Sequence, residues 1–370
     1  MLTIEERQPP PAMVGTSPFI DCDVHVTIPS RESLWPFMSE RWRRHDEQFA
    51  GNPPHGASYY PRASPGAARV DAWPGDGKPP GSDLGFMQEH YLDRWNLGYG
   101  VLGPLLIGGK SYSRNPGYAD ALARATNDWV VQDWLDLDPR LRSSIVVPYE
   151  FPDLAAAEVR RVARDSRFVQ VYLQIRTSMP LGNRAYWPLY EAAVEFGLPI
   201  GVHFGGSGGP AITGCGWPSY YLEDHVGNSQ TFQSQLTSLI CEGVFERYPE
   251  LRFVLIEGGV GWLPTLAWRL DHAFEEFRDE LGHVSRKPSE LIAEHVWLTS
   301  QPIEEPADPA SLTELLNLYP SVLNRLMFAS DYPHWDFDAP DEVLHKLKLS
   351  PSAQDRFLRL NASELYRLAE

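Results

Sequence analysis

Short apolar runs alternate with amphipathic segments along most of the 370-residue chain. The runs are rich in β-branched residues and are typical of buried strands, for example residues 19–26 (FIDCDVHV), 168–173 (FVQVYL), 198–206 (LPIGVHFGG) and 251–259 (LRFVLIEGG). Segments between them, such as 228–249, carry apolar residues at three- and four-residue spacing, which predicts helices. Continuous apolar strands alternating with such helices indicate a parallel sheet covered on both faces.

About eight strand candidates, most of them followed by a helix, predict an α/β fold of the (β/α)₈ TIM barrel type, distorted by insertions. A doubly wound open sheet is the alternative, but no G-x-G-x-x-G or P-loop motif follows the first strand. We expect a flexible lead-in over residues 1–18 and one barrel over 19–370, ending in short helices. Residues 29–83 are rich in Pro, Gly, Trp and Arg without clear periodicity, which predicts a long, lid-like insertion after the first strand.

Composition narrows the classes of partner. The chain has 49 acidic and 32 basic side chains, a formal net charge of −17, which disfavours nucleic acid. No uncharged apolar stretch approaches ~18 residues, and the start has no apolar signal region, so we expect no membrane association and a cytoplasmic location. Cys22, Cys215 and Cys241 lack C-x-x-C spacing, which argues against a disulfide framework or a thiolate zinc site.

Polar residues that can bind a metal lie at the predicted ends of four apolar strands: Asp23 with His25, His203, Glu257 and Asp331. Catalytic residues of such barrels come from the C-terminal ends of strands. In a strand, residues i and i+2 share a face, so Asp23 and His25 can point at one ion. Each residue alone could be a hydrogen-bonded core or turn residue. Together, carboxylates and imidazoles favour a site for Zn²⁺, Mn²⁺ or Fe²⁺.

Several segments resemble one family. Residues 19–25 (FIDCDVH) are similar to the I-D-x-H-x-H first strand of the amidohydrolase superfamily, in the amidohydrolase 2 branch that includes aminocarboxymuconate-semialdehyde decarboxylase. Residues 201–203 (GVH), 252–259 (RFVLIEGG), 328–334 (FASDYPH) and 361–366 (NASELY) extend the resemblance over nearly the whole chain. The resemblance implies a distorted (β/α)₈ barrel and, in this branch, sometimes a homodimer, although no feature of the sequence fixes the oligomeric state.

By that resemblance, one divalent ion, Zn or Mn, would be held by Asp23, His25, His203 and Asp331. Asp23 stands where many relatives have histidine, and the added negative charge makes Mn²⁺ competitive with Zn²⁺. Glu257 stands where relatives commonly place an acid/base histidine. We therefore expect Glu257 to be an ion ligand, a base with a raised pKa or a structural anchor.

The leading functional hypothesis is a metal-dependent hydrolase. A divalent ion lowers the pKa of bound water, and Asp331 beside that water would accept its proton. The resulting hydroxide would attack an amide, ester, lactone or ring C–N bond of a small, aromatic or carboxylated substrate. No G-x-S-x-G elbow points to a serine nucleophile.

The alternative is a non-oxidative decarboxylase of aromatic or unsaturated acids, a reaction that members of this branch also perform. That reaction needs a proton donor over the substrate ring, and without a histidine at position 257 the candidates are His225 and His334. We expect His225 in the loop after the fifth strand, overhanging the barrel mouth; a solvated loop histidine is its structural alternative. His334 could instead hydrogen-bond a nearby carboxylate. A barrel that binds without catalysis is a third hypothesis.

Aromatic residues close to predicted strand ends could form the walls of a substrate pocket. Trp217, Trp262 and Trp335 are the candidates, and packing beneath long loops is the structural alternative.

Overall fold

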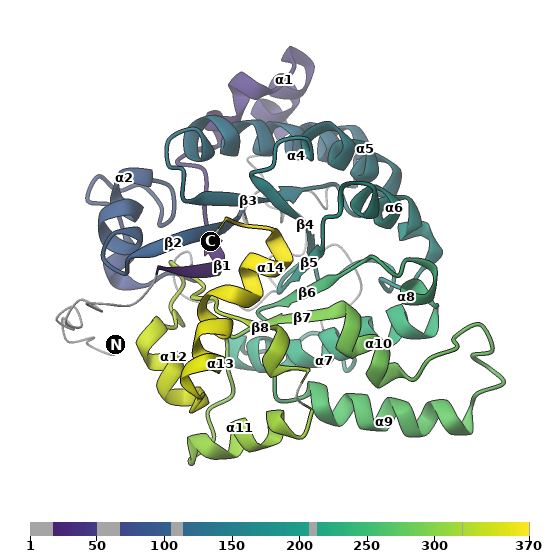
Figure 1. Ribbon diagram of the computed structural model, residues 1–370. Helices are drawn as coiled ribbons and strands as arrows, with labels where there is room; N and C mark the ends of the chain where they lie inside the picture. Colours follow the sequence, from purple (N-terminus) through teal and green to yellow (C-terminus); the bar gives the residue numbers. More distant parts are fainter. Residues whose placement is uncertain (1–17, 50–66, 105–113, 207–212, 320, 370) are drawn as a thin grey trace.

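The computed structural model describes residues 18–49, 67–104, 114–206, 213–319 and 321–369. Its centre is an eight-stranded parallel sheet in which each strand pairs with the next along the chain (Figure 1). The strands are β1 (Phe19–His25), β2 (Leu97–Gly103), β3 (Leu141–Val146), β4 (Phe168–Gln174), β5 (Ile200–His203), β6 (Phe253–Ile256), β7 (Val296–Thr299) and β8 (Leu326–Met327). The predicted lead-in, except for Pro18, lies outside the described residues.

The first strand meets the segment that follows β8, so the sheet closes into a barrel. Backbone hydrogen bonds join Cys22 N to Phe328 O at 3.0 Å and His25 N to Tyr332 O at 2.7 Å. A parallel bridge between Val24 and Tyr332 adds to this seam. The (β/α)₈ barrel predicted from the alternation of strands and helices is therefore confirmed.

Helices surround the barrel, as Figure 1 shows. The larger ones are α4 (Pro116–Val130), α5 (Pro152–Val162), α6 (Trp187–Phe196), α7 (Tyr221–Cys241), α9 (Leu263–Glu276), α10 (Pro288–His295) and α11 (Pro309–Asn317), with the shorter α8 (Val244–Arg247) after α7. Most of them carry proline in the first turn, where its missing N–H leaves no helical bond unmade. Among the described residues, no helix combines the length and apolar character needed to cross a membrane.

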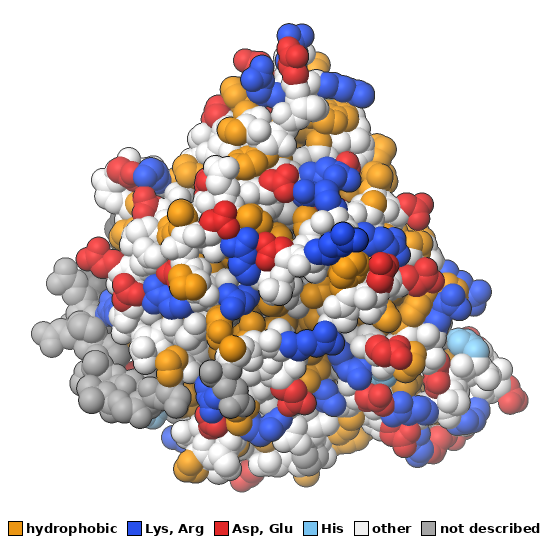
Figure 2. Space-filling view, turned by 45° about the horizontal axis from the view of Figure 1, so that its top comes forward, with side chains coloured by type: hydrophobic (Ala, Val, Ile, Leu, Met, Phe, Trp, Pro, Cys, Tyr) orange, Lys and Arg blue, Asp and Glu red, His pale blue; other side chains and the backbone are white. Residues whose placement is uncertain are grey.

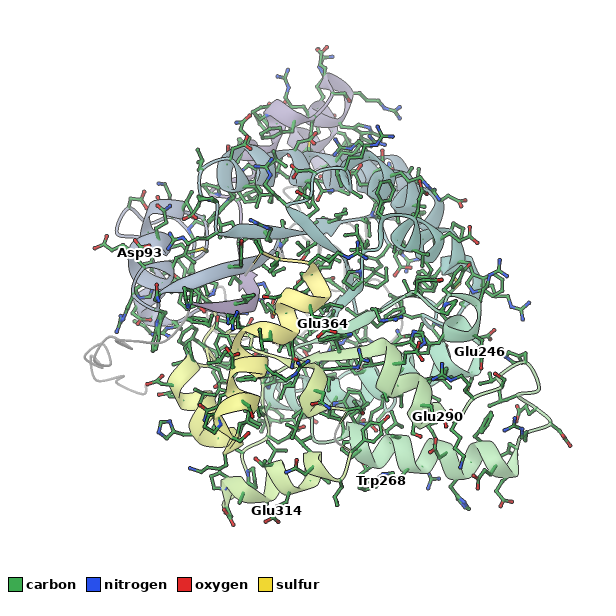
Figure 3. All side chains as sticks on the ribbon, in the orientation of Figure 1. Asp93, Glu246, Trp268, Glu290, Glu314 and Glu364 are labelled. Carbon is green, nitrogen blue, oxygen red and sulfur yellow. The ribbon has the colours of Figure 1, made fainter. Side chains whose placement is uncertain are left out.

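The last helix covers the end of the barrel at which the strands begin. After α12 (Pro340–Leu347) and α13 (Pro351–Asp355), a π-helical turn leads into α14 (Asn361–Tyr366). Tyr366 packs against the side chains inside the barrel and donates a hydrogen bond from its hydroxyl to Gln170 Oε1 at 3.0 Å. Glu364, on the same helix, is exposed at this end (Figure 3). The opposite end, where the strands finish, carries the polar residues singled out above.

Part of the predicted insertion 29–83 is described: η1 (Arg31–Phe37), α1 (Glu40–Phe49) and η4 (Val70–Ala72); residues 50–66 lie outside the described part. Asp46 of α1 is 2% exposed and anchors this segment. It accepts hydrogen bonds from Trp35 Nε1 at 2.8 Å and from the Tyr118 hydroxyl of α4 at 2.6 Å. Arg31 Nε lies 3.0 Å from the same carboxylate. One buried acid thus holds the first half of the insertion on the helical layer.

The second half of the insertion contacts the loop after β8. Ala68 and His334 form an antiparallel bridge, and Arg69 N donates to Pro333 O at 3.0 Å. Trp335 N donates to Ala67 O at 2.8 Å. The second half of this segment therefore borders the barrel mouth.

Before β2, α2 (Leu84–Met87) passes into η5 (Gln88–Leu92), and the chain enters β2 at Leu97. One helix differs from its predicted bounds. The helix predicted from residue 228 begins at Tyr221 instead, since the Glu223 carboxylate accepts the N–H groups of Ser219 and Tyr220 at 2.9 and 2.8 Å and caps its first turn. The expectation that His225 lies in a loop is therefore wrong; it lies on α7.

Candidate active site

Four side chains converge where the strands end: Asp23 and His25 from β1, His203 from β5 and Asp331 from the segment after β8. One ligand atom from each lies within 4.8 Å of all the others. The four residues are at most 3% exposed. His25 Nε2 lies 2.7 Å from Asp331 Oδ1, and His203 Nε2 lies 3.2 Å from Asp23 Oδ2. Residues far apart in the chain thus meet at one point at the barrel mouth.

Both imidazoles are oriented by backbone carbonyls. His25 Nδ1 lies 3.1 Å from Gly103 O, and His203 Nδ1 lies 2.6 Å from Phe204 O. Because a carbonyl only accepts, Nδ1 carries the proton in each ring, and the Nε2 lone pair faces the centre. This is the arrangement of metal-ligating histidines, whose other nitrogen donates to a carbonyl or carboxylate.

Several buried polar atoms at the centre have no hydrogen-bond partner among the residues that the structure describes. They are His25 Nε2, Asp331 Oδ2 and Glu257 Oε2. Buried polar groups without partners are costly and rare, so each calls for an explanation. A divalent cation would satisfy them, and two carboxylates with two imidazoles form a donor set that suits Zn²⁺ or Mn²⁺.

Two carboxylate residues at the mouth share an uncommon backbone conformation. Glu257 has φ 61° and Asp331 has φ 60°, in the left-handed region that non-glycine residues rarely adopt. Such residues cost about 1–3 kcal/mol each and persist where the surrounding structure fixes them, which is often at functional sites. Four other non-glycine residues of the described chain share this conformation, but Glu257 and Asp331 are the two that carry a carboxylate at the barrel mouth.

Glu257, directly after β6, faces the four converging side chains. Its Oε2 lies 3.2 Å from His203 Nε2, and the side chain is 7% exposed. Burial, reinforced by the negative charges of Asp331, Asp336 and Asp23, raises the pKa of this carboxyl well above its usual range. The sequence could not decide between its possible roles; the structure places it at the centre.

His334 is hydrogen-bonded to the same centre. Its Nδ1 lies 2.8 Å from Asp331 Oδ1, and its ring centroid lies 4.5 Å from that of His25. Although burial opposes it, the charge of the His334 imidazole and its hydrogen bond lower the pKa of Asp331 below its usual range. This position agrees with the hydrogen-bonding alternative for His334.

A second group of side chains adjoins the first. His225, Glu257 and Asp336 offer ligand atoms that lie within 4.8 Å of one another. His225 Nε2 lies 2.9 Å from Asp336 Oδ2. Sequence reasoning did not single out Asp336, although its place two residues after His334 in the DYPHWD run was an available signal.

The three tryptophans predicted to line a pocket have different surroundings. Trp335 is 49% exposed; its indole donates to the Tyr221 hydroxyl at 3.3 Å, and its ring lies 5.5 Å from that of His225. Trp262 is 9% exposed, belongs to the hydrophobic core and donates to Gly258 O at 2.8 Å. Trp217 is 51% exposed in the segment before α7. The structure thus brings Trp335 beside His225, whereas Trp262 has the packing role.

Asp21 was missed as a supporting residue, although it is the acid of the I-D motif. It accepts hydrogen bonds from the Tyr91 hydroxyl and from Ser330 Oγ, both at 2.5 Å, and from Ser330 N at 3.0 Å. Burial raises the pKa of Asp21 to about 7. These bonds tie β1 to the segment that carries Asp331 and so fix the spacing of the centre.

A family model described as Amidohydrolase matches residues 20–368, so the chain belongs to this family. The fold and the converging carboxylates and imidazoles agree with that assignment. Among curated proteins, a γ-resorcylate decarboxylase of Polaromonas sp. strain JS666 is 23% identical over 261 residues, which cover 68% of this chain and 77% of the relative.

Solved structures share the fold. An amidohydrolase of Mycobacterium avium subsp. paratuberculosis K-10 superposes with a TM-score of 0.69 at 21% identity, covering 95% of this chain and 98% of the other. A dihydroxybenzoic acid decarboxylase of Polaromonas sp. JS666, solved with manganese and the inhibitor 2-nitroresorcinol, gives a TM-score of 0.66 at 17% identity over 95% of this chain and 98% of the other.

Proposed function

We propose that the protein is a divalent-metal-dependent decarboxylase of small aromatic or unsaturated carboxylic acids. The observation that carries this proposal is the buried convergence of Asp23, His25, His203 and Asp331 at the barrel mouth. The comparisons support decarboxylation better than hydrolysis, which the sequence had ranked first, because relatives matching two thirds of the chain are named decarboxylases.

Asp23, His25, His203 and Asp331 would hold one ion, with each histidine using Nε2. When bound, the ion would supply positive charge that orients and polarises the substrate's carboxylate and an adjacent hydroxyl. Two carboxylate ligands suit the harder Mn²⁺ as well as Zn²⁺. Manganese is also the ion in the solved Polaromonas decarboxylase.

The chain's own residues have two further tasks in this reaction. Replacing a carboxylate by hydrogen consumes one proton for each CO₂ released, so a side chain must deliver that proton to the substrate carbon. The site must also limit access of bulk water. Hydrogen bonds from His334 to Asp331 and from the two histidine ligands to backbone carbonyls keep the carboxylates and rings in place.

Hydrolysis is the second candidate, because Glu257 replaces the histidine that relatives commonly use for acid/base work. A buried carboxylate beside the centre is suited to accept a proton from water. The two reactions differ in their products: a decarboxylase releases CO₂ without consuming water, whereas a hydrolase transfers a water oxygen to its product.

The test uses the full chain loaded with Mn²⁺ and, separately, with Zn²⁺. Each form is incubated with γ-resorcylate and a panel of hydroxylated benzoates in ¹⁸O-labelled water, and CO₂ and products are quantified. We expect CO₂ release with one equivalent of decarboxylated phenol that carries no ¹⁸O. No CO₂ from any acid, or ¹⁸O in a product acid released from amide, ester or lactone substrates, would contradict the proposal.

A further inference from the structure

With Asp23, His25, His203 and Asp331 assigned to the ion, the group formed by His225, Glu257 and Asp336 still has no assigned role. We infer that His225, held by Asp336, is the acid that delivers the proton to the substrate carbon. This inference rests on the proposed function and deepens it, because it names the residue that completes the reaction. Asp336 is then a positioning residue that acts through His225.

The contact within this pair is direct, and the pair adjoins the centre. His225 Nε2 lies 2.9 Å from Asp336 Oδ2, which leaves Nδ1 as the nitrogen that transfers the proton. Glu257 connects the two groups: it lies within 4.8 Å of the pair and 3.2 Å from His203 Nε2. A substrate whose carboxylate lies at the ion would therefore extend towards His225.

The surroundings of His225 suit an aromatic substrate better than a second cation. Its ring centroid lies 5.5 Å from that of Trp335, 5.7 Å from that of Tyr221 and 6.2 Å from that of Phe204. Flat apolar rings are the common walls of pockets that bind aromatic ligands. A cation would also have to displace the hydrogen bond that Asp336 already shares with His225.

The charge of the pair supports an acid. The hydrogen bond to Asp336 raises the pKa of His225, and burial raises the pKa of Asp336. A raised pKa increases the fraction of histidine that is protonated near neutral pH and can donate. The carboxylates of Asp224 and Asp331 act in the same direction, while burial of the ring opposes it.

A buried ion pair fixes the helical turn that carries His225. Asp224, the preceding residue on α7, lies 2.5 Å from Arg176 Nη2, and the two side chains are at most 7% exposed. The Arg176 guanidinium lies 4.9 Å above the Phe204 ring, next to the ligand His203. The start of α7 is thereby attached to the ends of β4 and β5, which keeps His225 at a constant position relative to the centre.

The proton and electrons balance without a further reactant. His225 gives its Nδ1 proton to the ring carbon that bears the carboxylate, which forms a C–H bond and interrupts the aromatic system. The C–COO⁻ bond then breaks, its electron pair restores the ring, and CO₂ leaves. His225, whose side chain is 16% exposed, regains a proton from solvent, so one proton is consumed in each cycle.

The test compares His225→Gln and Asp336→Asn with the wild type, all loaded with Mn²⁺. His345→Gln, on the exposed side of α12, is the matched control. With γ-resorcylate we expect kcat to fall at least about 10²-fold for His225→Gln, a smaller fall for Asp336→Asn, and no change for His345→Gln. Affinity for 2-nitroresorcinol should stay within about 3-fold, with one manganese per chain in every form.

A second readout isolates proton transfer. In D₂O the wild type should catalyse exchange of the ring hydrogen of resorcinol, the product of γ-resorcylate decarboxylation, and His225→Gln should not. Wild-type kcat and exchange in His225→Gln would overturn the inference alone. Two manganese ions per wild-type chain, one of them lost in both variants, would make the group a cation site. A wild type without CO₂ release or 2-nitroresorcinol binding would overturn the proposed function and this inference together.

Discussion

At the scale of single residues, Asp331 connects the backbone to the chemistry. Its backbone is left-handed, and its carboxylate contacts His25 and His334. We therefore expect even an isosteric substitution of Asp331 to impair activity strongly. The same substitution should leave the fold intact.

Asp331→Asn should abolish turnover, with a loss of at least about 10³-fold, because the amide removes the negative charge that would help hold the ion. The variant should also retain less manganese, as measured by elemental analysis after dialysis. Its far-ultraviolet circular dichroism should match the wild type. Wild-type rates in this variant would end the proposed role of Asp331.

His295 provides a pH prediction away from the site. It is fully buried, donates from Nδ1 to Leu251 O at 2.8 Å and stacks on Phe245, and burial lowers its pKa. Below the ordinary histidine pKa of about 6.5, the unfolded chain therefore binds a proton that the folded chain does not accept. The free energy of unfolding should therefore decrease as the pH is lowered through that range. This residue contributes at most about 1.4 kcal/mol per pH unit.

Denaturant titrations of the wild type and His295→Gln between pH 8 and 5.5 check this. The variant is expected to be less stable at pH 8, because it loses the fit of the ring, but its stability should decline less as the pH falls. Parallel pH profiles for the two proteins would show that His295 does not contribute to acid destabilisation.

Sequence reasoning found the four converging residues because the period of two in a strand and the strand-end rule place polar side chains at the mouth. It missed Asp336 and Asp21, since their roles depend on partners that the sequence does not bring together. His225 and Asp336 are separated by 111 positions, and Asp21 and Ser330 by 309. No pattern within a short stretch of sequence indicates that residues so far apart are in contact.

At the scale of elements, the alternation of strands and helices was predicted, whereas the start of α7 was not. The start of α7 at Tyr221 has no Ser, Thr, Asp or Asn in the N-cap position, and a carboxylate three residues further on does the capping. The seven-residue difference decides whether His225 lies on a loop or a rigid helix, and hence how precisely it is held.

The first half of the insertion is anchored by one buried carboxylate. Asp46→Ala should leave Arg31, Trp35 and Tyr118 without their shared acceptor, which costs about 2–4 kcal/mol locally. Limited proteolysis should then cut within η1 or α1 sooner, because local unfolding exposes the backbone. Asp120→Ala, which removes a more exposed i,i+4 pair with Arg124, is the control and should cost less than about 1 kcal/mol. Equal cleavage rates in both variants would contradict the anchoring role.

At the scale of the whole molecule, the closed barrel followed from eight repeated strand–helix alternations, a pattern that few other folds produce. The sequence predicted where the insertion lies but not which structure it adopts. Residues 29–83 lack periodicity, and their described parts are fixed by contacts with α4 and with the loop after β8. In Figure 2, acidic and basic side chains are interspersed over the face shown, so the net charge of −17 does not by itself mark a binding surface.

Metal binding should stabilise the whole molecule. Carboxylates brought together at the centre repel one another without a cation, and a ligand that binds only the folded state adds about 2.7 kcal/mol at 100 times its Kd. The Tm of chelator-treated protein should therefore rise with added Mn²⁺ or Zn²⁺, and less so for Asp331→Asn. A Tm that does not respond to either ion would argue against the site.

The packing of α14 against the barrel has a consequence for the order of folding. Tyr366 and Leu368 pack with side chains of the barrel interior, and Tyr366 bonds Gln170 across 196 positions of the chain. Contacts between residues so far apart in sequence form slowly, because the entropy of closing the intervening loop is lost before the contact stabilises anything. We therefore expect this end of the cylinder to seal only after the strands have paired.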